Sequence, residues 1–193
     1  MRGYRLRTAT EADIPALLAI LDGASEWLGS QGTDQWAGSR WRAEELRPDL
    51  ATGGLRVAEE LHPDQATGGL RVAAELRPDR ATGVSEAALA EAGRTAPPHQ
   101  PVPVATMTLG ETASSLHLSH FAVDRRFAGL GVGAWLIREA ADEAARRGKR
   151  SLRLDAWTTN TRLHDYYRRQ GFRLVRISGG NSGALFERAV SPR

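Results

Sequence analysis

Residues 124–135, DRRFAGLGVGAW, place three glycines at alternate positions directly before an alanine-rich segment with helical spacing. The preceding residues, LHLSHFAV, favour a strand, so the glycines lie in a strand-to-helix turn. Glycine lacks the Cβ that would keep a ligand away from the backbone, and it accepts positive φ angles. The start of the helix adds unpaired amide groups and the positive end of a helix dipole. The sequence therefore predicts a backbone cradle for a phosphate, to which Arg125 or Arg126 adds positive charge.

The composition is that of a globular protein of ordinary domain size. The chain has 193 residues, of which 41% are hydrophobic, and this is enough to bury a core. It has no cysteine, which excludes disulfides, zinc-thiolate sites and cysteine nucleophiles, and we expect no metal site. Its apolar runs are far shorter than the roughly 18 residues of a membrane span, and the first ten residues do not resemble a signal peptide. We therefore expect a soluble, cytoplasmic protein without a membrane partner.

The high isoelectric point of about 9.9 comes from arginine, because Lys149 is the one lysine. The formal net charge is only +3, and acidic residues are interspersed throughout the chain. Nucleic-acid binding usually needs a basic run with aromatic residues for stacking, and this sequence lacks such a segment. We therefore expect no nucleic-acid partner and favour a small anionic ligand.

Three nearly identical units of 15 residues follow one another in the first half of the chain. They are ELRPDLATGGLRVAE (45–59), ELHPDQATGGLRVAA (60–74) and ELRPDRATGVSEAAL (75–89). These units are shorter than common solenoid repeats and would lack a core of their own. We expect one unit to supply a helix end, a turn and a strand, and the extra copies to form a surface insertion, because loop-closure entropy rises slowly with length. The expected organisation is a single domain over residues 1–193, with the triplicated insertion at about 45–89 and a proline-rich loop at 92–103.

Periodicity predicts the other elements. The first residues, YRLRTAT, favour a strand, and Thr10 with Asp13 forms a capping box for a helix that runs toward Trp27. A second helix is expected from about Trp41 to Leu46. From residue 102 on, the pattern predicts an antiparallel hairpin (VPVATMTLG and SSLHLSHFAV), a helix from about 131 to 147, a strand (SLRLDAW), a helix from Asn160 to Gly171, and two final strands (FRLVRI and GALFERAV).

Three kinds of phosphate site use glycine-rich loops of this sort. A P-loop needs Lys and then Ser or Thr after its last glycine, and this chain has Ala134 and Trp135 there, so the P-loop is excluded. A dinucleotide-binding fold needs an acid on the next strand, and Asp155 lies 22 residues after Gly133. Against that fold, DRRFA separates the strand from the first glycine, and the preceding strands predict a hairpin. The third kind of site binds the diphosphate of coenzyme A.

Two motifs in this chain resemble the GNAT superfamily of N-acetyltransferases. Arg126-Phe-Ala-Gly129-Leu-Gly131 matches the Arg/Gln-x-x-Gly-x-Gly/Ala signature of that family. Residues 160–172, NTRLHDYYRRQGF, are similar to its second pattern, and the matching positions are Asn160, Tyr167, Gly171 and Phe172. The resemblance covers roughly residues 102–190 well and the amino-terminal strand and helix loosely, and the triplicated segment departs from it.

The resemblance implies an α/β (α+β) domain with a mixed, mostly antiparallel sheet of six to seven strands flanked by about four helices. Two central strands, LHLSHFAV and SLRLDAW, would splay apart and hold the pantetheine arm of acetyl-CoA as co-substrate. Backbone groups near Phe121 to Val123 would bind the pantetheine amides and polarise the thioester carbonyl. The residues that the resemblance assigns to acetyl-CoA binding are Phe121, Val123, Arg126, Ala128, Gly129, Leu130, Gly131, Gly133, Asn160 and Tyr167.

Acetyl transfer to an amine needs a base for the amine and a proton for the departing thiolate. The resemblance assigns the acid role to Tyr167, with the adjacent Tyr166 as competitor, whereas an aromatic residue on this helix face ordinarily packs in the core. Strand alternation places Leu116, Leu118, His120 and Ala122 on one face, and His117, Ser119, Phe121 and Val123 on the other. We take His120 as the candidate base, and His117 or a water chain remains as an alternative.

The expected function is that of an acetyl-CoA-dependent N-acetyltransferase that acetylates a primary amine of a small molecule or peptide by direct attack on the thioester. The family's acceptor pocket lies between the first helices and the final strands, which points to Trp27, Trp36 and Trp41, with Asp34 as an acid for a cationic amine. The alternatives are a non-catalytic acyl-CoA-binding or regulatory module of the same fold and an NAD-dependent oxidoreductase. A homodimer is compatible with all three.

Overall fold

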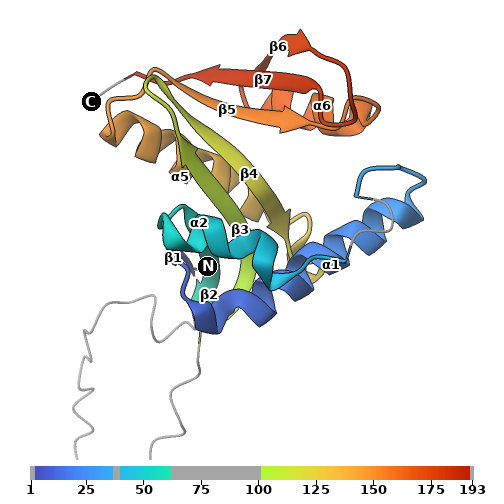
Figure 1. Cartoon of the computed structure of the whole chain (residues 1–193), viewed down its shortest axis with the longest axis vertical. Helices are drawn as coiled ribbons and strands as arrows, with labels where there is room; N and C mark the ends of the chain where they lie inside the picture. The colour runs from blue at the N-terminus through green and yellow to red at the C-terminus, as the bar shows by residue number, and fades with distance from the viewer. Residues whose placement is uncertain (1–2, 37–39, 62–100, 192–193) are drawn as a thin grey trace, which may run out of the picture.

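The computed structural model of the chain describes residues 3–36, 40–61 and 101–191. The centre of this part is a seven-stranded sheet with the order β1-β2-β3-β4-β5-β7-β6 (Figure 1). Neighbouring strands pair antiparallel, with the exception of the parallel pair β4 and β5. The predicted α/β fold with a mostly antiparallel open sheet is therefore confirmed, and the strand number is at the upper end of the expected range.

The elements agree with the sequence prediction to within a few residues. The strands are β1 (Gly3–Thr8), β2 (Leu55–Leu61), β3 (Val102–Glu111), β4 (Ser115–Val123), β5 (Ser151–Ala156), β6 (Arg173–Ile177) and β7 (Ala184–Ala189). The α-helices of the described residues are α1 (Ile14–Ser30), α2 (Ala43–Ala51), α5 (Val132–Arg146) and α6 (Thr161–Arg169), and two short 3-10 turns are η1 (Glu11–Asp13) and η2 (Arg125–Phe127). None of the helices in these ranges is long and apolar enough to cross a membrane.

The helices cover both faces of the sheet because each has one apolar side. On α5, residues spaced four apart are almost completely buried, and they are Val132, Leu136, Ala140 and Ala144. They pack with residues of β3, β4 and β5 in the larger hydrophobic cluster. A second cluster joins α1 to β2 and α2, and it also contains Ala122 of β4. The strand β4 therefore contributes to the cores on both faces of the sheet.

The first of the three repeated units forms part of the fold. Residues 45–59 span most of α2, a turn and the beginning of β2, which confirms the predicted helix end, turn and strand for one copy. The turn requires glycine twice. Gly53 has a φ of +69°, and a Cβ on Gly54 would lie 2.9 Å from the carbonyl oxygen of Leu109.

The sequences of the other two units differ from the first at positions that matter in the structure. The second unit has Ala74 where the first has Glu59, and the third has Val84 where the first has Gly54. The first unit is therefore the one of the three that has both Gly54 for the tight turn and the acidic Glu59. Residues 62–100 lie outside the described part, so the expected surface insertion and most of the proline-rich loop stay predictions. Val102 and Pro103 belong to β3, which corrects the predicted end of that loop.

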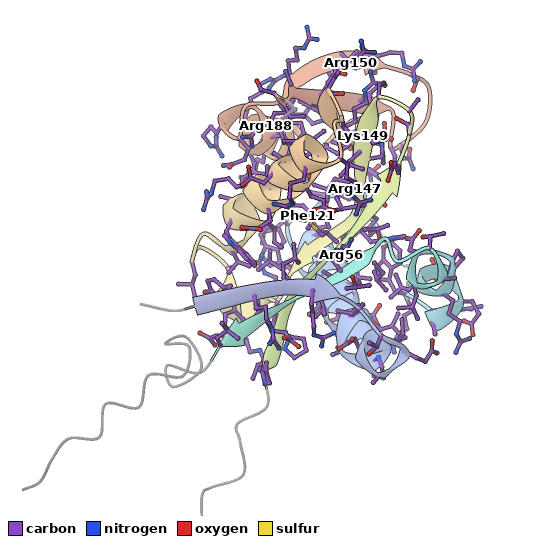
Figure 2. All side chains as sticks on the ribbon, turned by 90° about the vertical axis from the view of Figure 1, so that its left-hand side faces the viewer. Arg56, Phe121, Arg147, Lys149, Arg150 and Arg188 are labelled. Atoms are coloured by element: carbon purple, nitrogen blue, oxygen red, sulfur yellow. The ribbon has the colours of Figure 1, made fainter. Side chains whose placement is uncertain are left out.

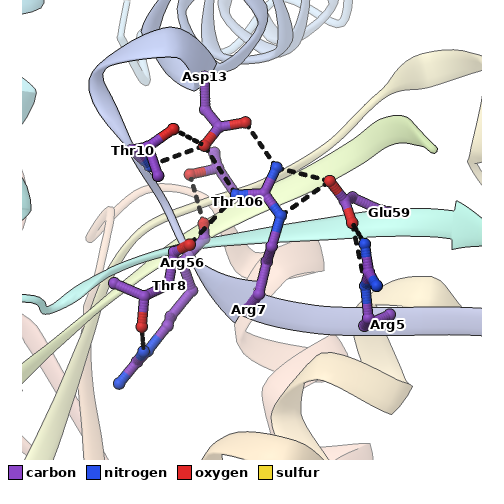
Figure 3. Close-up of polar contacts among 8 residues, drawn as sticks. All are labelled: Arg5, Arg7, Thr8, Thr10, Asp13, Arg56, Glu59 and Thr106. Carbon is purple, nitrogen blue, oxygen red and sulfur yellow. Dashed lines mark hydrogen bonds and ion pairs between the residues drawn. The ribbon is translucent and has the colours of Figure 1, made fainter. Parts of the chain in front are cut away.

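An ion-pair network around two buried carboxylates joins β1, β2 and the start of α1 (Figure 3). The guanidinium of Arg7 donates to both carboxylate oxygens of Asp13, at 2.8 and 2.7 Å, and to Glu59 through Nε, at 2.9 Å. Arg5 also donates to Glu59, at 2.7 Å. Asp13 in turn accepts from the backbone N–H of Thr10, which completes the predicted capping box. The network holds the first strand and the first helix at one edge of the sheet.

Ion pairs also fix the carboxyl end of α5 to the β3–β4 hairpin. Figure 2 labels Arg147 and Lys149, which follow α5. Arg147 pairs with Glu111 at 2.9 Å, and Lys149 pairs with the same carboxylate at 2.6 Å. Lys149 is itself buried and also donates to the carbonyl of Thr112 at 2.8 Å. Cations at a helix carboxyl end are favourable, so this contact anchors α5 at the end away from the glycine loop.

We expect Glu59→Ala, which introduces the residue of the second unit, to reduce the free energy of unfolding by about 2 kcal/mol, because it removes charge-assisted hydrogen bonds from two arginines. Chemical denaturation measures this loss. Arg47→Ala serves as the control, because Arg47 forms only exposed pairs with Glu11 and Glu44 and should cost less than about 0.5 kcal/mol. Equal losses in the two variants would mean that the network adds no more stability than an exposed ion pair.

The same network predicts a dependence of stability on pH. The Arg7 guanidinium lowers the pKa of Asp13 from its ordinary 3.8 to about 2. Folding therefore favours the ionised carboxylate, and this contribution is complete above about pH 4 and disappears as the pH falls through about 2. Thermal unfolding should show a lower Tm for Asp13→Asn than for the wild type at neutral pH, and a smaller difference as the pH falls over that window. A difference that stays constant would contradict the lowered pKa.

Candidate active site

The strands β4 and β5 separate in the middle of the sheet. Their parallel pairing runs from Ser115 opposite Ser151 to Leu118 opposite Leu154, where it ends. Beyond this point the two strands diverge, which Figure 1 shows in the middle of the sheet, and the predicted splay of the central strands is confirmed. A cavity of about 460 Å³ lies here, with β4 on one side and β5 and α6 on the other. We call it the central cavity.

A β-bulge in β4 shapes one wall of this cavity. Between Ala122 and Ser119 the strand advances three residues while β3 advances two, from Thr106 to Thr108. The extra residue is accommodated where His120 adopts a left-handed backbone conformation, with a φ of +45°. In the part of the chain that the structure describes, Trp36 is the one other non-glycine residue with positive φ.

The bulge overturns the predicted alternation along β4. Phe121 and Val123 pack against the same hydrophobic cluster as Leu116 and Leu118, whereas the alternation placed them on the opposite face. Ala122 belongs to the cluster on the α1 side. One inserted residue reverses the side of every residue that follows it.

Two histidines that border the central cavity each pair with an aspartate. His120 Nδ1 lies 3.0 Å from Asp49 Oδ2, and the imidazole meets the ring of Trp41 edge to face. His117 Nε2 lies 3.2 Å from Asp155 Oδ2. Both histidines border the cavity, so the structure does not separate the two candidate bases by the face of the strand.

The glycine loop leads into the cavity through the first turn of α5. Gly129 and Gly131 have φ angles of +77° and +80°, and Gly131 is the residue that caps the helix. The amides of residues 132–134 have no intrahelical acceptor, because the first such bond runs from Trp135 N–H to the carbonyl of Gly131 at 3.0 Å. Gly133 borders the cavity, and a Cβ there would lie 2.7 Å from the hydroxyl oxygen of Tyr166 and 3.6 Å from the ring of Phe121. The predicted strand, glycine turn and helix start are confirmed.

The two arginines before the loop lie in different places. Arg126 pairs with Asp124 at 2.6 Å, its side chain is 73% exposed, and it borders a separate cavity of about 280 Å³ beside α1. Its hydrogen bonds to Asp124, together with its charge, lower the pKa of that carboxyl. Arg125 borders the central cavity, where its guanidinium lies 3.8 Å from the centre of the Trp27 ring. Arg125 is therefore the nearer of the two to the predicted ligand site.

Tyrosines 166 and 167 of α6 both border the central cavity. Tyr167 is 6% exposed and packs against Phe172 and Phe186, and burial raises its pKa far above the ordinary value of 10. Tyr166 is less buried, and its pKa is also raised by burial. Tyr167 therefore packs in the core and also borders the cavity, and its assignment as the acid stays a prediction. At neutral pH its hydroxyl keeps its proton.

Side chains of residues 31–36 connect α1 to the segment between β5 and α6. Asp34 accepts from Trp157 Nε1 at 2.7 Å and from Thr159 Oγ1 at 2.9 Å, and these bonds lower its pKa. Gln35 accepts from the amide group of Asn160 at 2.7 Å. Asp34 is thus held by Trp157 and Thr159 and does not line the central cavity, and its expected place beside the acceptor stays a prediction.

The predicted site residues fall into three groups. Those that border the central cavity are Phe121, Val123, Gly133, Tyr167 and His120, together with Trp27 and Trp36. Asn160 caps α6 by accepting from Leu163 N–H, and it borders a neighbouring cavity of about 510 Å³ between the ends of α1 and α6. The residues that border neither cavity are Arg126, Ala128, Gly129, Leu130, Gly131 and Trp41. Asp49 and Gln35 are polar residues around the site that the sequence reading missed, because their partners are distant in the chain.

We expect the effect of Gly133→Ala on stability to depend on Tyr166. Alanine favours the helix by up to about 1 kcal/mol over glycine, but its Cβ would meet the Tyr166 hydroxyl. The Tyr166→Phe variant lacks this hydroxyl. In that background Gly133→Ala should therefore change the free energy of unfolding more favourably, by about 1 kcal/mol, than it does in the wild type. Thermal unfolding of the four variants measures this coupling, and a value near zero would contradict the close approach of Tyr166 to α5.

Comparisons with known proteins agree with this geometry. Residues 82–172 match the model of the acetyltransferase (GNAT) family. The uncharacterized N-acetyltransferase YesJ of Bacillus subtilis (strain 168) is 34% identical over 77 residues, which are 40% of this chain. The match spans 42% of that relative, which is less than half of its length.

Solved structures with the same fold cover nearly the whole chain. A GNAT acetyltransferase from Listeria monocytogenes 4b F2365 is similar with a TM-score of 0.64 and 16% identity, over 97% of this chain and 95% of the other. The PaiA N-acetyltransferase from Thermoplasma acidophilum, solved in complex with coenzyme A, has a TM-score of 0.65 and 13% identity, over 97% and 99% of the two chains. At these identities the likeness shows the fold. Residues 82–172 therefore resemble the acetyltransferases of the GNAT family in sequence, and the chain as a whole has the fold of the solved members.

Proposed function

We propose that this protein transfers an acetyl group from acetyl-CoA to a primary amine of a small molecule or peptide. The observation that carries the proposal is the central cavity itself. It passes between the separated strands and is bordered by the start of α5, by the hydroxyl-bearing Tyr167 and by His120. A donor with a long thin arm and a separate amine could therefore meet in one place.

The residues of the cavity suit the acyl carrier. The first amides of α5 and the missing Cβ at Gly133 leave room and hydrogen-bond donors for a diphosphate. The edge of β4 beyond Leu118 faces the cavity instead of β5, which leaves backbone groups near Phe121 for the pantetheine amides. The related structure from Thermoplasma acidophilum was solved with coenzyme A, which supports the same ligand class here. The thioester would supply an activated acetyl group.

The chemistry assigned to this chain is a direct transfer. The amine nitrogen bonds to the acetyl carbon as the carbon–sulfur bond breaks, and the products are an acetylated amine and a free thiol. His120 accepts the proton that the amine loses. Tyr167 donates a proton to the departing sulfur, and its burial keeps the hydroxyl protonated until that moment.

The competing functions find less support. Asp155, the acid that a dinucleotide fold would use for the ribose, pairs with His117 at the cavity. The strands before the glycine loop form an antiparallel hairpin rather than a parallel unit. A non-catalytic acyl-CoA-binding module shares the fold and the cradle, so the experiment has to separate binding from turnover.

Two measurements on the wild type test the proposal. Calorimetry should detect binding of acetyl-CoA, and a screen of amines should find one that releases free thiol. If calorimetry detects no heat on titration with acetyl-CoA, the assignment of the central cavity as an acetyl-CoA site is wrong. Binding without thiol release for any amine would favour the non-catalytic module.

For Tyr167→Phe we expect acetyl-CoA affinity to stay within about twofold while kcat falls by about 100-fold, because the variant lacks the proton donor. Tyr4→Phe is the matched control. Tyr4 lies on β1 against Trp135, and its buried hydroxyl has no hydrogen-bond partner in the described part of the chain, so its loss should not change kcat. Full turnover by Tyr167→Phe would remove Tyr167 from the acid role.

A further inference from the structure

Asp49 approaches the central cavity from α2 and contacts the candidate base. Its Oδ2 atom lies 3.0 Å from His120 Nδ1, across 71 positions of sequence. Both side chains are largely buried, with exposed fractions of 22% for His120 and 29% for Asp49. The threonine hydroxyl of Thr108 lies 3.3 Å from the same ring nitrogen. Two oxygen atoms are therefore directed at Nδ1.

This arrangement selects one form of the neutral imidazole. A carboxylate only accepts hydrogen bonds, so Nδ1 must carry the proton that it shares with Asp49. In the other form two lone pairs would face each other at 3.0 Å. Nε2 then carries the lone pair, and no described residue has a hydrogen bond to it. Because His120 borders the central cavity, this nitrogen is available to accept a proton there.

The ring is also held from the side. Trp41 meets the imidazole edge to face, with 5.3 Å between the ring centres. Trp41 is fixed in turn by hydrogen bonds to Ser25, at 3.1 Å from Nε1, and to Asp22, at 2.9 Å from the backbone nitrogen. Residues of α1 and of the chain before α2 therefore restrict the rotation of the His120 ring.

The backbone of His120 has an energetically unfavourable conformation. A side chain with a Cβ is disfavoured at a φ of +45°, and such residues persist where their surroundings hold them. His117 lacks these features. It lies on the regular part of β4, it pairs through Nε2, and its partner Asp155 is more exposed, at 42%. The two histidines are therefore held by different nitrogens.

We propose that Asp49 is a positioning residue for acetyl transfer, acting through His120. It holds the proton on Nδ1 and so directs the basic Nε2 toward the acceptor amine. During transfer the amine proton moves to Nε2, while the Nδ1 proton stays shared with Asp49, which offsets the positive charge on the ring. This inference rests on the proposed function for its catalytic part. Its structural part, the form of the imidazole, can be measured without turnover.

Nitrogen-15 NMR of the wild type provides that measurement. The ring signals of His120 are assigned by their loss in His120→Gln. At a pH where the ring is neutral, we expect the proton on Nδ1 in the wild type. In Asp49→Asn, whose amide can also donate to Nδ1, we expect the Nε2–H form to appear. A wild-type ring with its proton on Nε2 would overturn the proposal, and this result is read from the wild type, with the folded His120→Gln variant needed only to assign the signals.

Turnover provides the second arm. For Asp49→Asn we expect kcat to fall by about 10- to 100-fold, with acetyl-CoA affinity within about twofold of the wild type. Asp49→Glu keeps a carboxylate and should recover part of the loss. Glu44→Gln is the matched control, because it removes one negative charge from an exposed position on the same helix and should leave kcat unchanged.

The outcomes are separable from those of the proposed function. If no amine is acetylated by the wild type, the proposed function fails, although the NMR result still decides whether Asp49 sets the form of the ring. If the wild type is active and Asp49→Asn keeps both its kcat and the Nδ1–H form, the positioning role is overturned. If kcat falls equally in Glu44→Gln, the loss of activity comes from the removal of a negative charge on α2 and not from the contact with His120, and the proposal also fails.

Discussion

The parallel pairing of β4 and β5 ends at Leu118 and Leu154, and the rest of the site depends on this early end. A continuous sheet would fill the space with paired backbone, whereas the diverging strands leave a cavity that reaches both faces of the sheet. The start of α5 borders it, and so do residues of α1 such as Trp27. The β-bulge at His120 contributes to this separation, because it bends β4 just beyond the point where its pairing with β5 ends.

Much of the fold follows from local sequence signals. Capping at Thr10, the four-residue spacing of buried side chains on α5 and the glycines after Asp124 are all properties of short segments, and the structure contains each of them. The bulge has no such signal. A positive φ is uncommon for any non-glycine residue, so a histidine does not announce one, and the alternation of β4 is regular through residue 120. The faces of Phe121 and Val123 were therefore predicted wrongly.

The polar contacts of the site show the same limit. The glycine loop and Tyr167 could be found because they lie in short motifs. Asp49 could not, because its partner is 71 positions away and because its segment is nearly identical to two later copies. The hydrogen bonds of Asp34 were missed for a related reason. An acid close to tryptophans in the sequence suggests a binding pocket, whereas in the structure it accepts hydrogen bonds from Trp157 and Thr159.

The contacts of Asp34 and Gln35 have a mechanical consequence. They join the half of the sheet that carries α1 to the half that carries α6, at a place where β4 and β5 no longer pair. The two halves are thus joined here by a few side-chain hydrogen bonds rather than by a ladder of main-chain bonds. Opening this end to a bulkier acceptor would require a few side chains to turn, and the seven strands could keep their register while it happened.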